Sequence, residues 1–157
     1  MSVPAVIEDI LTKHNIEFAV VDAHPTASLI GEAKSTLLQD GKGKAQVIYP
    51  GDCILDLDAL CRLTERELKA CNPDDVQTLC SKARLERLPT VPMALGLDVI
   101  IDQSLLTNSE LKLDTGSERS LITMNIEQFK QLISGSQSGS IAIKESDLQS
   151  ASLDDIN

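Results

Sequence analysis

Two short stretches carry residue types that could act on a phosphate or an ester. Lys34 lies at the start of a predicted strand, and its ammonium group is a compact cation suited to a phosphate. Thr115, Gly116 and Ser117 form a predicted turn, where glycine permits close approach and backbone amides could stabilise a developing oxyanion. Both stretches also fit a structural role, because an edge lysine discourages sheet pairing and a Gly-Ser pair is common in tight turns.

No other group forms a recognised catalytic or metal-binding pattern. His24 precedes Pro25 without a nucleophile motif beside it, so it fits a loop residue better than a general base. Glycine-rich phosphate loops and the HExxH and GxSxG motifs are absent from the sequence. The cysteines are too widely spaced for a metal knuckle and too few for a disulfide-rich secreted scaffold: Cys53, Cys61, Cys71 and Cys80. We therefore expect no metal, no cofactor and reduced thiols.

Composition narrows the class of protein further. The chain has 157 residues, and 42% of them are hydrophobic, which is enough for one substantial core. Only 2% are aromatic, which argues against stacking platforms for unpaired bases. The net charge is -10, so any contact with RNA requires a local pocket or a positive patch. Residues 1–15 include Glu8 and Asp9 and no basic leader, so we expect a cytoplasmic protein without a signal peptide or membrane span.

Local patterns predict helices and strands mixed irregularly along the chain. Apolar residues at helical spacing predict a first helix over residues 3–11, and Asp56, Asn72 and Asn125 are expected to begin three more. Gln128 is expected to complete a capping box with Asn125. The mixture indicates an α+β fold with a mixed, partly closed, barrel-like sheet flanked by helices. The other predicted segments are a helical turn at 31–33, an irregular packed loop at 88–96, and strands at 16–21, 34–39, 45–49, 98–102, 110–114 and 119–124.

A change of composition at Ser134 marks the expected end of the folded domain. The segment SGSQSGS and the acidic residues that follow it have little apolar surface to bury. We therefore expect a domain over residues 1–133 and a flexible tail or linker over residues 134–157. The folded part stays acidic without this tail.

The order of several short motifs is more specific than any one of them. In chain order they are His24-Pro25-Thr26, Ala33-Lys34-Ser35 opening a hairpin, Tyr49-Pro50-Gly51-Asp52, Leu55-Asp56-Leu57, a proline loop, and Asp114-Thr115-Gly116-Ser117 before the last helix. Over residues 1–133 this order resembles the YbaK/prolyl-tRNA-synthetase-associated family of aminoacyl-tRNA editing domains, and is closest in pattern to versions fused to bacterial signalling domains.

This resemblance implies a mixed barrel and the hydrolysis of mischarged aminoacyl-tRNA by a trans-editing deacylase. It implies that Lys34 binds the terminal adenosine or its phosphate, and that Gly116 and Ser117 line the aminoacyl pocket. It implies as partners the acceptor end of a tRNA, or an aminoacyl-adenosine-like ligand, and an aminoacyl-tRNA synthetase. The ester is already activated, so neither a metal nor a dedicated nucleophile is required. Further substrate-binding positions are expected at His24, Pro92, Thr115 and, without an assigned role, Asp52.

The proline loop departs from the family pattern. The family has glycine four residues before the proline, whereas this chain has Leu88 before Pro92. A leucine there could fill the pocket or reroute the loop. The alternative function is therefore a non-catalytic ligand- or RNA-binding regulatory module on the same fold. For either function we expect one pocket between Lys34, the 88–96 loop and the 115–117 turn.

Overall fold

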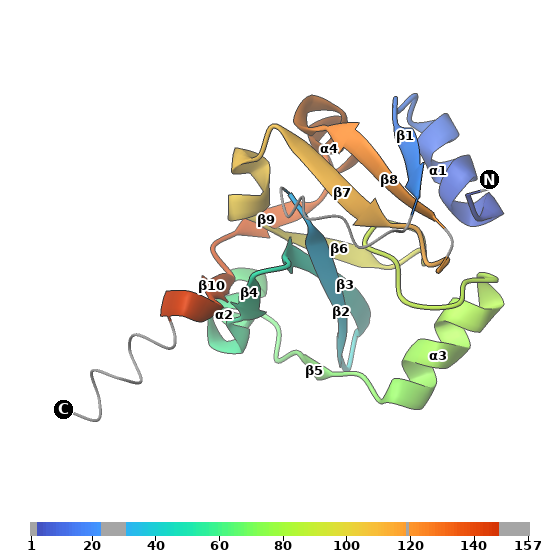
Figure 1. The fold of residues 1–157 in the computed structure, drawn as a ribbon. Coiled ribbons are helices and arrows are strands. Elements are labelled where there is room, and N and C mark those ends of the chain that lie inside the picture. Colours follow the sequence, from blue (N-terminus) through green and yellow to red (C-terminus); the bar gives the residue numbers. More distant parts are fainter. Residues whose placement is uncertain (1–2, 23–30, 119, 148–157) are drawn as a thin grey trace.

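The computed structural model describes residues 3–22, 31–118 and 120–147. The predicted site residue His24 lies outside these residues. Helices and strands alternate irregularly along the chain (Figure 1). Their bounds are α1 Ala5–Lys13, β1 Ala19–Asp22, β2 Ala33–Asp40, β3 Gly43–Pro50, β4 Cys53–Leu55, α2 Leu57–Thr64, β5 Lys69–Ala70, α3 Pro73–Lys82, β6 Asp98–Asp102, the 3-10 helix η1 Gln103–Thr107, β7 Glu110–Asp114, β8 Ser120–Asn125, α4 Ile126–Leu132, β9 Gln137–Gly139 and β10 Ala142–Lys144.

The strands form three sheets rather than a closed barrel within the described residues. The largest has the order β5-β2-β3-β6-β9, with antiparallel pairing in the β2–β3 hairpin and parallel pairing of β6 with both β3 and β9. A second sheet has the order β1-β8-β7, and β10 pairs with β4. The α+β class and the mixed strand directions are confirmed.

The central strand β3 is buried on both faces, which divides the core into two clusters. Ile48 packs with α1, α4 and the β1-β8-β7 sheet on one face. Val47 and Tyr49 point to the other face and pack with Leu60 of α2. Alternation of side chains along a strand produces this division. One strand therefore joins both halves of the molecule.

Short-range capping signals predicted the helix starts correctly. The side chains of Asp56, Asn72 and Asn125 each accept a hydrogen bond from a backbone N–H in the first turn of α2, α3 and α4. The second half of the capping box is wrong, because the Oε1 atom of Gln128 instead accepts a hydrogen bond from the backbone N–H of Glu17 at 2.8 Å. A contact with a distant segment has replaced the local one.

The helical turn predicted at residues 31–33 is wrong. Glu32 forms a bridge with Lys112 of β7, and the C=O of Gly31 accepts a hydrogen bond from the N–H of Lys112 at 2.9 Å. Gly31 has φ +68°, and a Cβ atom there would collide with the backbone C=O of Glu110. A bridge from Glu32 to β7 and the start of β2 at Ala33 occupy the place of the helical turn.

The segment from residue 134, expected to be a flexible tail, contains two strands within residues 137–147. β9 joins the large sheet, and β10 pairs with β4. Ile141, between them, is fully buried, and its N–H donates to Oδ1 of the buried Asp102 at 2.8 Å. Short polar strands can be held by main-chain pairing and one apolar anchor, so their composition does not reveal them. Residues 148–157 lie outside the described part.

Candidate functional site

The β2 strand has an open edge in the middle of the molecule. On the side away from β3, Glu32 bridges β7, and pairing with β5 begins only at Leu38. In the described residues no strand pairs with 34–37 on that side, and the N–H of Cys71 donates to the C=O of Leu37 at 3.1 Å. This part of β2 instead borders α3 and the chain at 85–90. Lys34 therefore lies on a strand edge that no other strand covers within the described residues.

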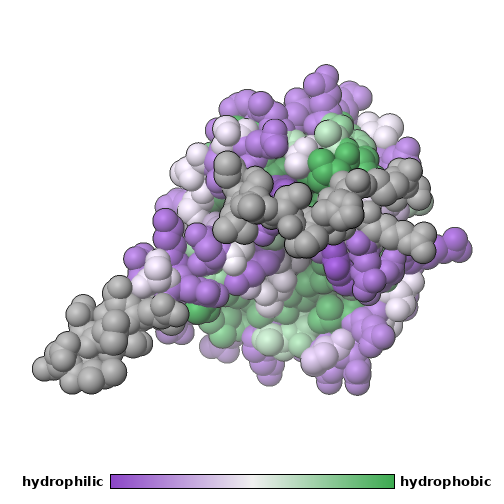
Figure 2. Space-filling view, viewed as in Figure 1, coloured by the Kyte–Doolittle hydropathy of each residue, from purple (hydrophilic) through white to green (hydrophobic). Residues whose placement is uncertain are grey.

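A cleft of about 620 Å³ lies along this edge. Residues 35–37 of β2, the start and inner side of α3, and residues 85–88 line it. Figure 2 shows hydrophobic residues exposed on this face of the molecule between hydrophilic ones. Ser35, Glu86 and Arg87 supply polar groups at its margin. An apolar cleft of this size with a few polar groups is typical of a small-ligand site.

The proline loop is anchored to the β2–β3 hairpin next to the cleft. The Oγ–H of Ser35 and the Nε2–H of the fully buried Gln46 both donate to the C=O of Pro89, at 2.8 and 3.0 Å. These bonds hold Leu88 at the cleft wall. Residues 88–96 form no regular element, and Pro92 is buried in them, so the predicted irregular packed loop is confirmed.

Hydrogen bonds also join this loop to the turn after β7. The N–H of Thr90 donates to the C=O of Asp114 at 3.0 Å, and the N–H of Asp114 donates to Oγ1 of Thr90 at 2.6 Å. The C=O of Gly116 accepts from the N–H of Glu86, and Nε of Arg87 contacts Oδ2 of Asp114 at 2.8 Å. The structure therefore brings the proline loop and the 115–117 turn together.

The turn uses its own amides internally. The N–H of Gly116 donates to Oδ1 of Asp114 at 2.7 Å, and the N–H of Ser117 donates to Oγ1 of Thr115 at 3.3 Å. Gly116 has φ +86°, and a Cβ atom there would lie 3.0 Å from both the C=O of Arg87 and Cδ2 of Leu85. Glycine at this position thus meets a backbone requirement.

Lys34 does not line the cleft. Its Nζ lies 5.3 Å from the centre of the Tyr49 ring and 3.9 Å from Oε1 of Glu145. Tyr49 is the cross-strand partner of Lys34, so both side chains lie on the face opposite to Ser35. Thr36 shares the face of Lys34 and still lines the cleft, which places the cleft at the strand edge.

Asp52 belongs to a different cleft, of about 740 Å³, together with Cys53 and Asp102. Burial, followed by the nearby charge of Asp52, raises the pKa of the Cys53 thiol to about 11. This thiol is therefore a poor nucleophile at neutral pH. No group of three or more metal-ligating side chains occurs in the part of the chain that the structure describes.

Sequence reasoning missed Ser35, Gln46 and Arg87 as residues of the site. Their roles depend on Pro89 and Asp114, which are distant in sequence. The Lys34-Ser35 motif was the one local signal that could have found Ser35, since a strand residue next to a candidate lysine faces the other side.

The aminoacyl-tRNA editing domain profile matches residues 17–132. The chain belongs to this family. A search of curated proteins finds no match. No helix in the described residues of the editing domain is long and apolar enough to cross a membrane.

Solved structures share the fold of the editing domain. One, provisionally described as a signal transduction protein from Marinobacter aquaeolei VT8, has a TM-score of 0.83 and 22% identity, and the alignment covers 91% of this chain and 31% of that chain. Another, provisionally described as a trans-editing enzyme for prolyl-tRNA synthetase, has a TM-score of 0.69 and 20% identity, covering 92% of this chain and 98% of that chain. The editing domain thus corresponds to less than a third of the first protein.

Proposed function

We propose that the editing domain is a trans-editing deacylase that hydrolyses the ester of a mischarged aminoacyl-tRNA. Water adds to the ester carbonyl, the bond from the carbonyl carbon to the ribose oxygen breaks, and the free amino acid and the tRNA leave. The observation that carries this proposal is the apolar cleft along the open edge of β2 in a chain of this family. A deacylase needs such a cleft to select the side chain of the mischarged amino acid.

The proposed roles follow from the positions of the residues around the cleft. Its apolar wall, which includes Leu88, accepts the amino acid side chain. Lys34, at the open edge with 38% of its side chain exposed, binds the phosphate or the adenosine of the acceptor end. Gly116 and Ser117 do not line the cleft, but they accept hydrogen bonds from Glu86 and Arg87 at its margin and keep their proposed role at the aminoacyl end.

The remaining predicted positions keep supporting roles in this proposal. Pro92 and Thr115 are buried and shape the loop and the turn. Asp52 and His24 are retained as substrate-binding positions to be tested. The proposed partners are the acceptor end of a tRNA and an aminoacyl-tRNA synthetase, and the proposed location is the cytoplasm.

A regulatory module that binds aminoacyl-tRNA without hydrolysing it is the second candidate. The turn geometry favours it, because the N–H groups of Gly116 and Ser117 are already used inside the turn. Removing one hydrogen-bond donor to the oxyanion costs about 10²–10³ in rate, so a deacylase with this turn would need other groups to donate to the oxyanion. The similarity to a structure described as a signal transduction protein agrees with this candidate.

Deacylation of a panel of mischarged tRNAs separates the two candidates. The deacylase releases at least one amino acid well above the rate of spontaneous hydrolysis, and correctly charged tRNAs stay intact. The regulatory module binds aminoacyl-tRNA in a filter or polarisation assay and leaves every ester intact. If the protein neither binds nor hydrolyses any tRNA, both candidates fail.

A further inference from the structure

Three lysines form a row that leads from the cleft to the tip of the β2–β3 hairpin. In the β5-β2-β3 sheet, Gln39 pairs with Lys69 on one side and with Lys44 on the other. Lys42 follows in the hairpin turn. Directly paired residues in adjacent strands have their side chains on the same face. Lys69 and Lys44 therefore flank Gln39 on one face of the sheet.

This face is the one that carries the cleft. Leu37 and Ser35 alternate with Gln39 along β2, and both line the cleft. Cys71, two residues after Lys69, also lines it. Lys44 pairs with Gln39, two residues along β2 from Leu37, so it lies beside the same end of the cleft. The row thus begins where the cleft ends.

These lysines take no part in the ion pairs of the described residues. Within residues 3–22, 31–118 and 120–147, no ion pair involves Lys42, Lys44 or Lys69, whereas Lys34 and Lys130 have carboxylate oxygens within 3.9 and 3.6 Å. Three neighbouring lysines outside any ion pair of the described residues stand out in a chain with a net charge of -10. A row of this kind fits a polyanion.

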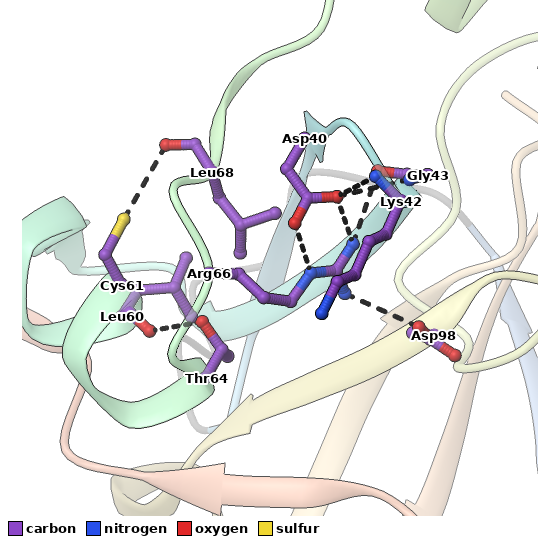
Figure 3. Close-up of polar contacts among 9 residues, drawn as sticks. All are labelled: Asp40, Lys42, Gly43, Leu60, Cys61, Thr64, Arg66, Leu68 and Asp98. Carbon is purple, nitrogen blue, oxygen red and sulfur yellow. Dashed lines mark hydrogen bonds and ion pairs between the residues drawn. The ribbon is translucent and has the colours of Figure 1, made fainter.

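Acidic residues also lie beside the row. Glu65 and Glu67 line a recess at the hairpin tip together with Asp40, Lys42 and Lys69. The carboxylate of Asp40 accepts two hydrogen bonds from Arg66 (Figure 3). Burial raises the pKa of the Cys71 thiol, and the charge of Asp75, at the start of α3, contributes to that shift. The carboxylates of Glu65, Glu67 and Asp75 are exposed and border the row, and they limit how far along it a polyanion can lie.

We infer that Lys42, Lys44 and Lys69 bind the phosphate backbone of the acceptor stem of a tRNA whose aminoacyl end lies in the cleft. Adjacent strands are about 4.8 Å apart, so the Cα atoms of Lys44 and Lys69 are about 10 Å apart and their side chains can reach neighbouring phosphates. Phosphate contacts of this kind position a nucleic acid without reading its sequence. The inference rests on the proposed function for the occupant of the cleft.

Binding of two RNAs tests the row. One is an acceptor-stem minihelix ending in CCA, and the other is the CCA trinucleotide alone. The double variant Lys44→Gln/Lys69→Gln should bind the minihelix about tenfold more weakly than the wild type, with a salt dependence (log K against log salt) shallower by about two. Binding of the trinucleotide should not change. The matched control is Lys13→Gln/Lys130→Gln, which removes two charges from α1 and α4, and it should behave as the wild type.

The outcomes separate this inference from the proposed function. If the wild type, the double variant and the control bind the minihelix equally well, the three lysines do not bind the acceptor stem and the inference is wrong. The inference is also wrong if the wild type does not bind the minihelix. Hydrolysis of an aminoacylated CCA trinucleotide by the wild type is measured separately and reports on the deacylase alone. Thermal unfolding of each variant confirms that the fold is intact.

Discussion

Arg66 contacts Asp40 through two parallel hydrogen bonds, from Nε to Oδ2 and from Nη2 to Oδ1, both at 2.8 Å. Their side chains are only 14% and 11% exposed. Nη2 of Arg66 also donates to the C=O of Gly43 at 3.3 Å, so the guanidinium ties the hairpin turn to the segment after α2. A planar guanidinium suits this two-point contact better than a lysine ammonium would.

This pair predicts a pH-dependent contribution to stability. The hydrogen bonds from Arg66 hold the pKa of Asp40 well below its usual 3.8. A lowered carboxyl pKa stabilises the fold at pH values above the unfolded pKa, and the contribution is lost as the pH falls. Asp40→Asn should therefore lower the free energy of unfolding at pH 7, and the difference should shrink below about pH 4. Urea unfolding across pH measures it. Asp9→Asn, on an exposed part of α1, is the control, and a difference independent of pH would contradict the assignment.

The C-terminal strands should contribute to the stability of the domain. Ile141 is fully buried, so Ile141→Ala should cost about 2–5 kcal/mol of unfolding free energy. Ile143, on the next strand, is 37% exposed, and Ile143→Ala should cost less than about 1 kcal/mol. Chemical denaturation of both variants tests the difference. Equal small losses would mean that residues 137–147 do not belong to the cooperative fold.

Gly116 should be required for the fold. Gly116→Ala places a Cβ atom 3.0 Å from the C=O of Arg87 at a positive φ, and should cost at least about 1 kcal/mol. A Cβ atom at Gly41 meets no atom within 4 Å, so Gly41→Ala should change stability by no more than about 0.5 kcal/mol. Thermal unfolding compares the two. If both variants melt like the wild type, the turn does not need glycine at this position.

Lys34 should act on the ligand rather than on stability. Lys34→Ala removes a proposed charge-assisted contact, so binding or turnover should fall roughly ten- to hundredfold. Stability should change by less than about 1 kcal/mol, because the ion pair with Glu145 is exposed. Glu145→Gln breaks the same ion pair and keeps the cation, so its activity should match the wild type. Unchanged activity in Lys34→Ala would mean that Lys34 does not bind the ligand and only discourages pairing at the strand edge.

Leu88 should set the size of the side chain that the cleft accepts. Leu88→Ala enlarges the cleft and should favour larger aminoacyl esters by at least about tenfold in kcat/KM relative to small ones. Leu95 is half-buried in the same loop and does not line the cleft, so Leu95→Ala is the control. The ratio of kcat/KM for two esters is the measurement. An unchanged ratio would remove Leu88 from the substrate pocket.

The parts of the site that sequence reasoning predicted are those encoded in single segments. The irregular loop at 88–96 was predicted from its prolines, and the turn at 115–117 from its glycine, and the structure joins the two. The expected single pocket with Lys34 was not found among the described residues, because the Lys34 side chain points to the face of Tyr49. Which of two neighbouring strand residues faces a ligand depends on the register of the strand, and a shift of the register by one residue exchanges the two faces.

Elements that short-range signals encode were determined by the sequence itself. The hairpin strands and the caps Asp56, Asn72 and Asn125 depend on backbone and side-chain groups a few residues apart. The tertiary structure alone decided the pairing of β9 and β10, the bridge between Glu32 and Lys112, and the convergence of Ser35 and Gln46 on Pro89. Each of these depends on hydrogen bonds between segments distant in the chain, and their partners exist only once the fold has brought those segments together.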